Sequence, residues 1–307
     1  MVNDTAGDPV SGLKWTRKTT EKLSRQLRKM GIVVSANTVA RLLKLQGYSL
    51  RVNHKSVSHS KSPNRDRQFK KIFRTRRTFE REQMPVISVD TKKKEQIGQF
   101  KNQGAVWAHN AILVYDHDFK RYAIGMAIPF GIYDTTANQA HVCVGTSHDT
   151  PAFAVDALVT WWQNAGQKLY PKAKKILILA DNGGGNGSKN RAWKLNLQTK
   201  LSDAFKLSVT VCHYPPGTSK WNPIEHRVFS QISKNWAGQP LNSYETVLKY
   251  ISTTKTETGL AVTSMLLRGE YPIGLKIQKG DMDKLRVQPH PALPDWNYTI
   301  RPSTPVA

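Results

Sequence analysis

Cysteine is scarce in this chain of 307 residues, which contains only Cys143 and Cys212. Because the two are not in a paired spacing, we expect neither a disulfide framework nor a cysteine-rich zinc site, and we expect a reducing compartment. Long apolar runs are also missing, since no stretch approaches the roughly 18 residues that a membrane helix needs. The first residues, MVNDTAGDPV, have neither the basic region nor the apolar core of a secretory signal. We therefore expect a cytoplasmic protein without a membrane partner.

Acidic residues are few as well: 22 Asp and Glu stand against 46 Lys and Arg, which gives a net charge of +24. Such a surplus is typical of proteins that bind a polyanion. Residues 1–81 contain 20 Lys and Arg but only 5 Asp and Glu, so this quarter of the chain carries 15 of the 24 net charges. Composition alone leaves DNA, RNA and anionic lipid open as partners.

Two amphipathic helices are predicted in the basic N-terminal part. The first ends at Gly31, and the second can begin at Ser35 or Asn37 and ends at Gly47. Two short helices joined by such a turn resemble a helix-turn-helix, whose second helix enters a DNA groove. A small basic helical hairpin is the alternative. The outer side chains of the second helix that would meet DNA are Asn37, Thr38, Arg41 and Lys44.

From Met84 onward the chain alternates between apolar runs and amphipathic segments. The order of predicted elements is β-β-β-α-β-α-β-α, which favours an α/β fold with a mixed five-stranded sheet flanked by helices. One further helix is predicted between about Ser243 and Thr256, and five prolines follow Gln288 in a tail. The predicted strands are PVISVD, AIPFGIYD, HVCVGT, KILILAD and LSVTVC.

Three acids stand at the ends of these elements. Asp90 ends the first strand, Asp181 ends the fourth, and Glu225 begins the helix after the fifth. In a sheet of this order the three carboxylates can converge, and oxygen ligands without thiols suit Mg²⁺ or Mn²⁺. Two such ions, about 3.5–4 Å apart, support displacement at phosphorus. The pattern therefore predicts a two-metal site acting on a phosphodiester.

Each acid also has an ordinary structural explanation. Asp is common where a strand passes into a loop, and Glu225 together with Asn222 fits a capping box at the start of a helix. The histidines make no i, i+4 metal pair, so we expect no zinc; they include His141, His148, His213 and His226. Four other acids are rivals. Asp149, just before the capping residue Thr150, fits a turn, and the other three lack a converging partner: Asp116, Asp118 and Asp134.

The stretch LILADNGGGNG, residues 177–187, places four glycines just after Asp181. It is not a phosphate-binding P-loop, because no Gly-Lys-[Ser/Thr] ends the glycine run. Glycines instead leave room beside the carboxylate for a metal and a DNA backbone. The sequence gives no physical reason for Asn182.

The segment PPGTSKWNPIE, within residues 212–229, resembles the Pro-Ser-Asn-Pro-x-Glu signature that carries the last acid of many DDE transposases. More closely, the chain resembles the Rhodopirellula-type DDE transposases of Azoarcus-type bacterial insertion sequences. The resemblance covers about residues 11–300. The segments that carry it are PVISVDTKKKE at 85–95, SHDTPAFAVDALVTWW at 147–162, the turn at 181–187, VCHYPPGTSKWNPIEHRVFS at 211–230 and PDWNYTI at 294–300.

This resemblance implies an RNase H-like catalytic fold with Asp90, Asp181 and Glu225 as the DDE triad. Family members usually have Gly directly after the second acid, where this chain has Asn182. They are also usually longer at the N-terminus, so we expect an incomplete DNA-binding region. The implied organisation is a helix-turn-helix-like region at 1–52, a basic linker at 53–83, the catalytic domain at 84–260 and a C-terminal extension at 261–307.

The expected function is that of an insertion-sequence transposase, which cuts element ends with two Mg²⁺ or Mn²⁺ ions and joins the 3′-hydroxyl to target DNA. Its partners would be the double-stranded terminal repeats and the target DNA, bound by a homo-oligomer associated with the nucleoid. Lys220 and Arg227 would contact phosphates along with the basic N-terminal region. Two alternatives are an RNase H-like nuclease without strand transfer and an inactive DNA-binding remnant of a transposase.

Overall fold

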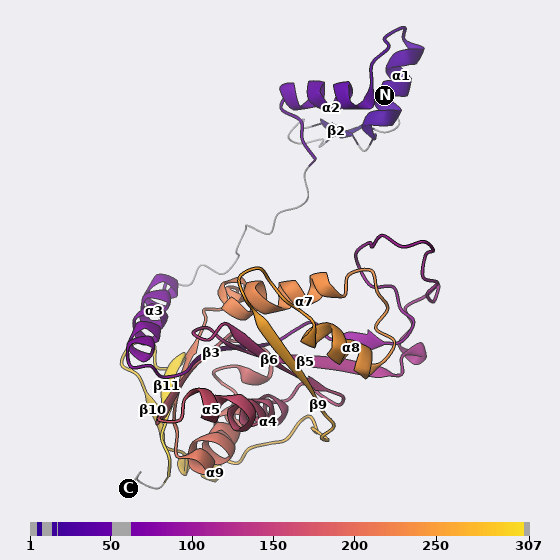
Figure 1. Ribbon diagram of the computed structural model, residues 1–307. Coiled ribbons are helices and arrows are strands. Elements are labelled where there is room, and N and C mark those ends of the chain that lie inside the picture. Colours follow the sequence, from indigo (N-terminus) through magenta and orange to yellow (C-terminus); the bar gives the residue numbers. More distant parts are fainter. Residues whose placement is uncertain (1–4, 8–13, 17, 51–62, 304–307) are drawn as a thin grey trace. The chain divides into compact units, whose positions relative to one another are not determined.

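The computed structural model of the chain describes residues 5–7, 14–16, 18–50 and 63–303 (Figure 1). The chain divides into two compact units, Met1–Val57 and Ser58–Ala307. The predicted linker at 53–83 falls partly outside the described residues, and the rest of it belongs to the second unit. None of the described helices is long and apolar enough to cross a membrane.

The first unit contains the two predicted helices, α1 (Thr20–Lys29) and α2 (Ala36–Leu45). A short antiparallel pair, β1 (Thr5–Gly7) and β2 (Lys14–Thr16), precedes them. Thr19 caps α1, and Ser35 rather than Asn37 caps α2 by accepting a hydrogen bond from the Thr38 amide. Gly31 and Gly47 follow the helices with φ of +84° and +82°, the left-handed conformation that ends a helix.

The second unit is built on one mixed sheet of nine strands. Its five central strands lie in the order β6-β5-β3-β7-β8, in which β3, β7 and β8 are parallel while β5 is antiparallel to β3 and β6. These are the five predicted strands, and their arrangement confirms the RNase H-like α/β fold class. Their bounds are β3 Val86–Thr91, β5 Gly125–Asp134, β6 Gln139–Gly145, β7 Lys175–Ala180 and β8 Ser208–His213.

The sheet has four more strands than the sequence predicted. The residues assigned to a C-terminal extension supply three of them, because β9 pairs with the edge strand β6 while β11 and β10 extend the sheet beyond β8. Adding strands at both sides pairs backbone groups that the five-stranded sheet would leave at its edges. The added strands are β4 Glu95–Ile97, β9 Ala261–Leu267, β10 Val287–Pro289 and β11 Asn297–Ile300.

Helices cover both faces of this sheet (Figure 1). On one face, α4 and the helix that begins with α6 bury Phe153, Trp193 and Leu197 against the central strands. On the other face, α7 and α8 cover β5, β6 and β9, while α3 covers β3, β7 and β8. The α-helical bounds are α3 Arg65–Arg81, α4 Pro151–Trp161, α5 Gln167–Leu169, α6 Arg191–Asn196, α7 Ser230–Asn235, α8 Tyr244–Ser252 and α9 Lys279–Asp283.

Helix α3 is therefore part of the packed second unit, although the sequence interpretation placed it in a linker. Its Ile72 and Phe79 are each 5% exposed, and they pack with apolar side chains of β3, β7 and β8. The basic composition of the helix hid this apolar stripe. Three π-helical segments continue or begin helices, at Trp162–Gly166, Leu197–Asp203 and Glu225–Phe229, and short 3₁₀ turns lie at Lys120–Tyr122, Gly184–Asn186 and Ser219–Trp221.

Candidate active site

Asp90 and Asp181 lie side by side at the ends of adjacent parallel strands. In the register of β3 and β7, Val89 pairs with Ala180, and each aspartate is the next residue along its strand. Parallel strands present their carboxyl ends at the same edge of a sheet, which is where open α/β sheets carry their sites. The amide of Thr91 donates a hydrogen bond to Asp90 Oδ1 at 2.8 Å.

Glu225 is fixed to the same strand by a buried asparagine. Asn222 is fully buried; its Nδ2 donates to the carbonyl of Val89 at 3.0 Å, and its Oδ1 accepts from the hydroxyl of Ser88. The same hydroxyl accepts from the amide of Ile224 at 3.1 Å, so the residues before Glu225 are tied to the strand of Asp90. Among the hydrogen bonds of the described residues, none joins the Glu225 carboxylate to the Asn222 amide. The capping-box explanation therefore finds no support in this arrangement.

The three carboxylates influence one another. The pKa of Asp90 is raised to about 8, mainly by burial and next by the charge of Asp181; the Glu225 carboxyl contributes to the rise, and the hydrogen bond from Thr91 opposes it. Burial also raises the pKa of Asp181, and the charges of Glu225 and Asp149 add to this effect. These shifts reflect repulsion among neighbouring carboxylates, which a cation between them would relieve.

Asp149 belongs to this acidic neighbourhood, although the sequence suggested only a turn residue. Its Oδ1 accepts from the hydroxyl of Thr91 at 3.1 Å, and Lys94 lies 3.6 Å from its Oδ2. Within residues 18–50 and 63–303, no three acidic, histidine or cysteine side chains are arranged closely enough to hold a metal ion as they stand. The carboxylates of Asp90, Asp181 and Glu225 would have to draw together around an ion.

The glycine turn after Asp181 is closed by two asparagines. Asn182 Oδ1 accepts from the amide of Ser188 at 3.0 Å, which gives this residue the structural role that the sequence did not reveal. With its amide nitrogen facing Asp181, Asn186 donates to Asp181 Oδ1 at 3.3 Å and to the carbonyl of Gly183 at 2.7 Å. Gly184 has φ of +60°, a conformation that favours glycine. The turn therefore holds the Asp181 carboxylate from one side.

A buried histidine holds Asp181 through its backbone. His213 ends β8; its Nδ1 lies 2.9 Å from the Asp181 carbonyl oxygen and its Nε2 lies 3.1 Å from the Tyr298 hydroxyl. Trp193 Nε1 donates to the same hydroxyl at 3.0 Å. Burial is the main reason that the pKa of His213 falls to about 4, so the ring is neutral. Its Nδ1–H must then donate to Asp181, and the Tyr298 hydroxyl donates to Nε2.

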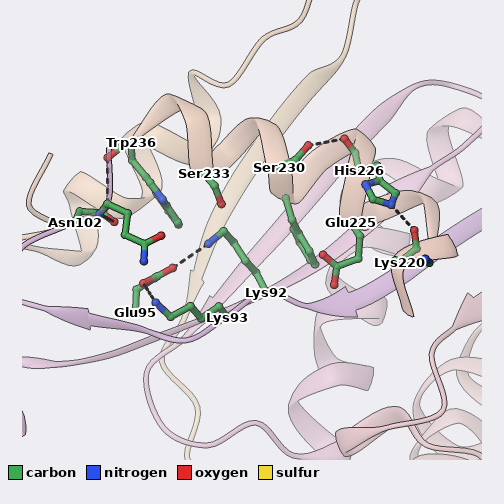
Figure 2. Close-up of a pocket in the computed structure, with 12 residues that line it drawn as sticks. Lys92, Lys93, Glu95, Asn102, Lys220, Glu225, His226, Ser230, Ser233 and Trp236 are labelled. Carbon is green, nitrogen blue, oxygen red and sulfur yellow. Dashed lines mark hydrogen bonds and ion pairs between the residues drawn. The ribbon is translucent and has the colours of Figure 1, made fainter. Parts of the chain in front are cut away.

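A groove of about 570 Å³ opens beside Glu225 (Figure 2). Lys92, Lys220 and Trp236 are among its lining residues. Lys92 is 7% exposed; its Nζ contacts Glu95 at 2.9 Å and lies 4.4 Å from the centre of the Trp236 ring. Burial lowers the pKa of Lys92, while Glu95 opposes that change. The lysine-rich run after Asp90 gave no sign of this burial, because a charge run is usually solvated.

The site thus combines two aspartates at one edge of the sheet with a neighbouring groove lined by lysines, in a chain of net charge +24. A family profile described as Rhodopirellula transposase DDE domain matches residues 1–302. The chain belongs to this transposase family. The comparison with curated proteins finds no match.

Among solved structures, the chain is similar to several structures of Mos1 transposase. A Mos1 paired-end complex with the left transposon end has 16% identity over 76% of this chain and 65% of that chain, with a TM-score of 0.45. The Mos1 Strand Transfer Complex has 16% identity over 76% and 64%, with a TM-score of 0.44. A Mos1 mariner paired-end complex with Mn has 15% identity over 76% and 65%, also with a TM-score of 0.44. The chain thus spans about 65% of the length of the Mos1 chains that it matches.

The side chains predicted to contact DNA lie in three places in this chain. Lys220 lines the groove beside Glu225, and its carbonyl accepts a hydrogen bond from His226 Nε2 (Figure 2). Arg227 is exposed, and its charge opposes the rise that burial causes in the pKa of Tyr133. It is not among the residues that line the groove. On α2, in the first unit, Asn37, Arg41 and Lys44 are exposed, and Thr38 is half-buried with its hydroxyl bonded to Ser35 at the helix start.

The rival acids have other roles. Asp134 is fully buried and accepts hydrogen bonds from two amides of the β5–β6 turn at 2.9 Å and from the Tyr170 hydroxyl at 2.8 Å. Asp134 is a structural acid at the end of β5, where it pairs with Ile87 rather than with Asp90. The Asp116 side chain is 85% exposed, and it pairs with His117 at 3.1 Å. Asp118 lines a separate pocket with Lys93 and Lys101.

Proposed function

We propose that this chain is a metal-dependent DNA transposase that cuts the ends of an insertion sequence and joins the resulting 3′-hydroxyl to target DNA. The observation that carries the proposal is the approach of Asp90, Asp181 and Glu225, expressed in the raised pKa values of the two aspartates. Family membership and the basic groove beside Glu225 support the same conclusion.

Asp90, Asp181 and Glu225 would hold two Mg²⁺ or Mn²⁺ ions. The fit is chemical: the three groups are carboxylates, the ligands that these hard cations prefer, and in the absence of a cation they repel one another. When bound, such ions activate an attacking oxygen and stabilise a leaving one at phosphorus. The chain itself supplies the rigid support, because Thr91, Asn186 and His213 each hold one of the two aspartates in place.

The positive side chains would bind the substrate. Lys220 and the Lys92–Glu95 pair line the groove into which a DNA strand beside the reacting phosphate would pass. Arg227 would contact phosphate outside this groove. On α2, Asn37, Arg41 and Lys44 would face a DNA groove and read terminal sequence, and Thr38 would stabilise the start of the helix. We further propose that the protein acts as a homo-oligomer on double-stranded DNA in the nucleoid.

The test is a joint cleavage and joining assay. Labelled duplexes from the DNA that flanks the coding sequence are incubated with the full chain, a target plasmid and Mg²⁺ or Mn²⁺. We expect a cut at the element end and a labelled product joined to the plasmid. Asp181→Asn should abolish both products and leave DNA binding intact, whereas the matched control Asp116→Asn, which changes an exposed acid, should retain both.

The outcomes separate the alternatives. Cleavage without joined product would identify a nuclease of the same fold, and DNA binding without cleavage in the wild type would identify an inactive DNA-binding remnant. Unchanged cleavage by Asp181→Asn would remove the triad from the mechanism.

A further inference from the structure

Helix α3 has a cationic stripe that the active site does not use. The exposed cations of the helix are spaced by three and four residues: Arg67, Lys70, Arg74, Arg77 and Arg81. At about 100° per residue these five positions fall within roughly 80° of one another on the helix surface. The residues of α3 that face the sheet, Gln68, Ile72 and Phe79, lie on the opposite side. The stripe therefore points away from the sheet.

The stripe is not neutralised by neighbouring acids. Within residues 63–303, no ion pair involves a member of the stripe, and its closest recorded ring contact is Arg77 over Phe73 at 5.6 Å. Glu80 is engaged by Arg76 at 2.6 Å, and Glu82 by Lys175. Asp66 lies in the first turn, where the helix dipole stabilises a carboxylate. Five adjacent cations that make no ion pair within residues 63–303 repel one another, which an external polyanion would relieve.

Helix α3 is also rigidly attached to the catalytic unit. Gln68 is fully buried; its Nε2 donates to the carbonyl of His213 at 2.7 Å and to Asn297 Oδ1 at 2.9 Å. Asn297 returns a bond to Gln68 Oε1 at 2.7 Å. Because His213 also supports Asp181, the helix and the candidate active site share one hydrogen-bonded frame. A cationic stripe fixed in this way keeps a constant position relative to the reacting phosphate.

The stripe begins beside the loop that leads to Glu225. Phe69 of α3 lies 6.0 Å from the Trp221 ring, and Lys220 Nζ lies 5.8 Å from the same ring. Trp221 is 55% exposed. From Arg67 to Arg81 the stripe is about 21 Å long at 1.5 Å per residue. That length matches about six nucleotides of a DNA strand, which carries one phosphate per 3.4 Å.

We propose that the outer face of α3 binds the phosphate backbone of the DNA duplex as it leaves the active site, along a path from Lys220 and Trp221 to Arg81. The contact is independent of sequence, because phosphates carry no base information. It rests on the proposed action on DNA, and it adds a binding surface to the triad and to the helix α2 contacts.

The test measures the binding of a random-sequence duplex by the full chain, without divalent metal, over a range of salt concentrations. The stripe variant is Arg67→Gln, Arg74→Gln and Arg81→Gln together. Each lost phosphate contact should reduce the slope of log affinity against log salt by about 0.9, hence by up to about 2.7 for the three, and affinity should fall by about tenfold or more at low salt.

Two matched variants separate the local surface from general charge. Lys249→Gln, Lys255→Gln and Lys284→Gln remove the same charge from exposed lysines elsewhere in the second unit, and they should leave the slope near the wild-type value. Arg67→Lys, Arg74→Lys and Arg81→Lys keep the charge and should retain the slope. Circular dichroism and the unfolding temperature confirm that each variant is folded.

The proposal would be overturned if the stripe variant and the triple lysine variant lost the same amount of slope. An unchanged slope in the stripe variant would also overturn it. Binding of polyglutamate is measured in parallel with the same proteins. If the stripe variant lost polyglutamate binding but kept DNA binding, the surface would be assigned to an acidic protein, and the proposal would equally be overturned. The proposed function fails separately, through the absence of metal-dependent cleavage in the wild type. That result would not move the salt slope.

Discussion

His213 and Asp181 are joined through the protein interior: Nδ1 of the histidine lies 2.9 Å from the carbonyl oxygen of the aspartate. The histidine is fully buried, and Tyr298 and Trp193 complete a chain of hydrogen bonds behind it at 3.1 and 3.0 Å. Tyr298 belongs to β11, so a strand near the end of the sequence supports an acid near its middle. We infer that His213 is a positioning residue, which acts by holding the backbone that presents the Asp181 carboxylate.

Replacing His213 should lower cleavage without lowering DNA affinity. In His213→Asn the amide nitrogen can occupy the place of Nδ1 and keep the bond to Asp181, whereas His213→Gln places its polar atoms near Nε2 and loses that bond. Residues that support metal ligands typically affect activity or metal affinity by about 10–100-fold. We expect that loss in His213→Gln, with partial recovery in His213→Asn, in cleavage rates titrated with Mn²⁺.

The control for this prediction is His109→Gln, which changes an exposed histidine and should behave as the wild type. Equal activity of His213→Gln and His109→Gln would show that the bond to Asp181 has no positioning role.

The same histidine should by itself make the protein less stable in mild acid. Burial lowers the pKa of His213 from 6.5 to about 4, so below pH 6.5 the unfolded state binds a proton that the folded state excludes. The stability that depends on the neutral ring is present above that pH and is lost as pH falls towards 4. Between pH 7 and pH 5 the loss should be about 2 kcal/mol.

Urea unfolding at both pH values, for the wild type and for His213→Asn, measures this contribution. Asp90 and Asp181 act in the opposite direction because their pKa values are raised, so the difference between the two proteins isolates the histidine. An equal change in the stability of the wild type and of the variant on acidification would contradict the assignment.

Asn222→Ala should destabilise the protein and reduce cleavage together. The substitution leaves the Val89 carbonyl without its hydrogen bond inside the core, and it releases the segment that carries Glu225. A buried polar group left without a partner costs about 1–3 kcal/mol. Urea unfolding should show that loss, and Asn110→Ala, at an exposed asparagine, should show none. Full stability of the Asn222 variant would mean that the bond to β3 is not maintained in solution.

Asn182 should control the glycine turn rather than the chemistry. Its side chain accepts the amide hydrogen of Ser188, so Asn182→Ala should expose that amide to exchange with solvent while Asn182→Asp, which keeps an acceptor, should protect it. Hydrogen exchange of residues 183–188 is the measurement. Equal exchange in the alanine and aspartate variants would remove the proposed role.

The features that the sequence predicted correctly are those set by local patterns. Apolar runs that end in Asp90 and Asp181 form buried parallel strands, and the register of those strands places the two acids together. Gly31 and Gly47 lie just beyond the last residues of α1 and α2, as the predicted helix ends require. These signals depend on residues a few positions apart, which a single sequence displays directly.

The features that were missed depend on distant partners. The strands β9 and β11 take their place from neighbours far along the chain, and the bonds of His213 to Tyr298 and of Gln68 to Asn297 span 85 and 229 residues. Asn222 has the sequence signature of a helix cap, but its side chain is used by β3 instead. A polar residue that serves two elements cannot be assigned from the pattern of one.

The central claim is that Asp90, Asp181 and Glu225 form one metal site. A crystal of the full chain grown with Mn²⁺ tests it most directly, through anomalous scattering at the manganese edge. Two manganese peaks about 3.5–4 Å apart are expected among the three carboxylates, with the loss of at least one peak in Asp181→Asn. Manganese bound only elsewhere, or an unchanged pair of peaks in that variant, would contradict it.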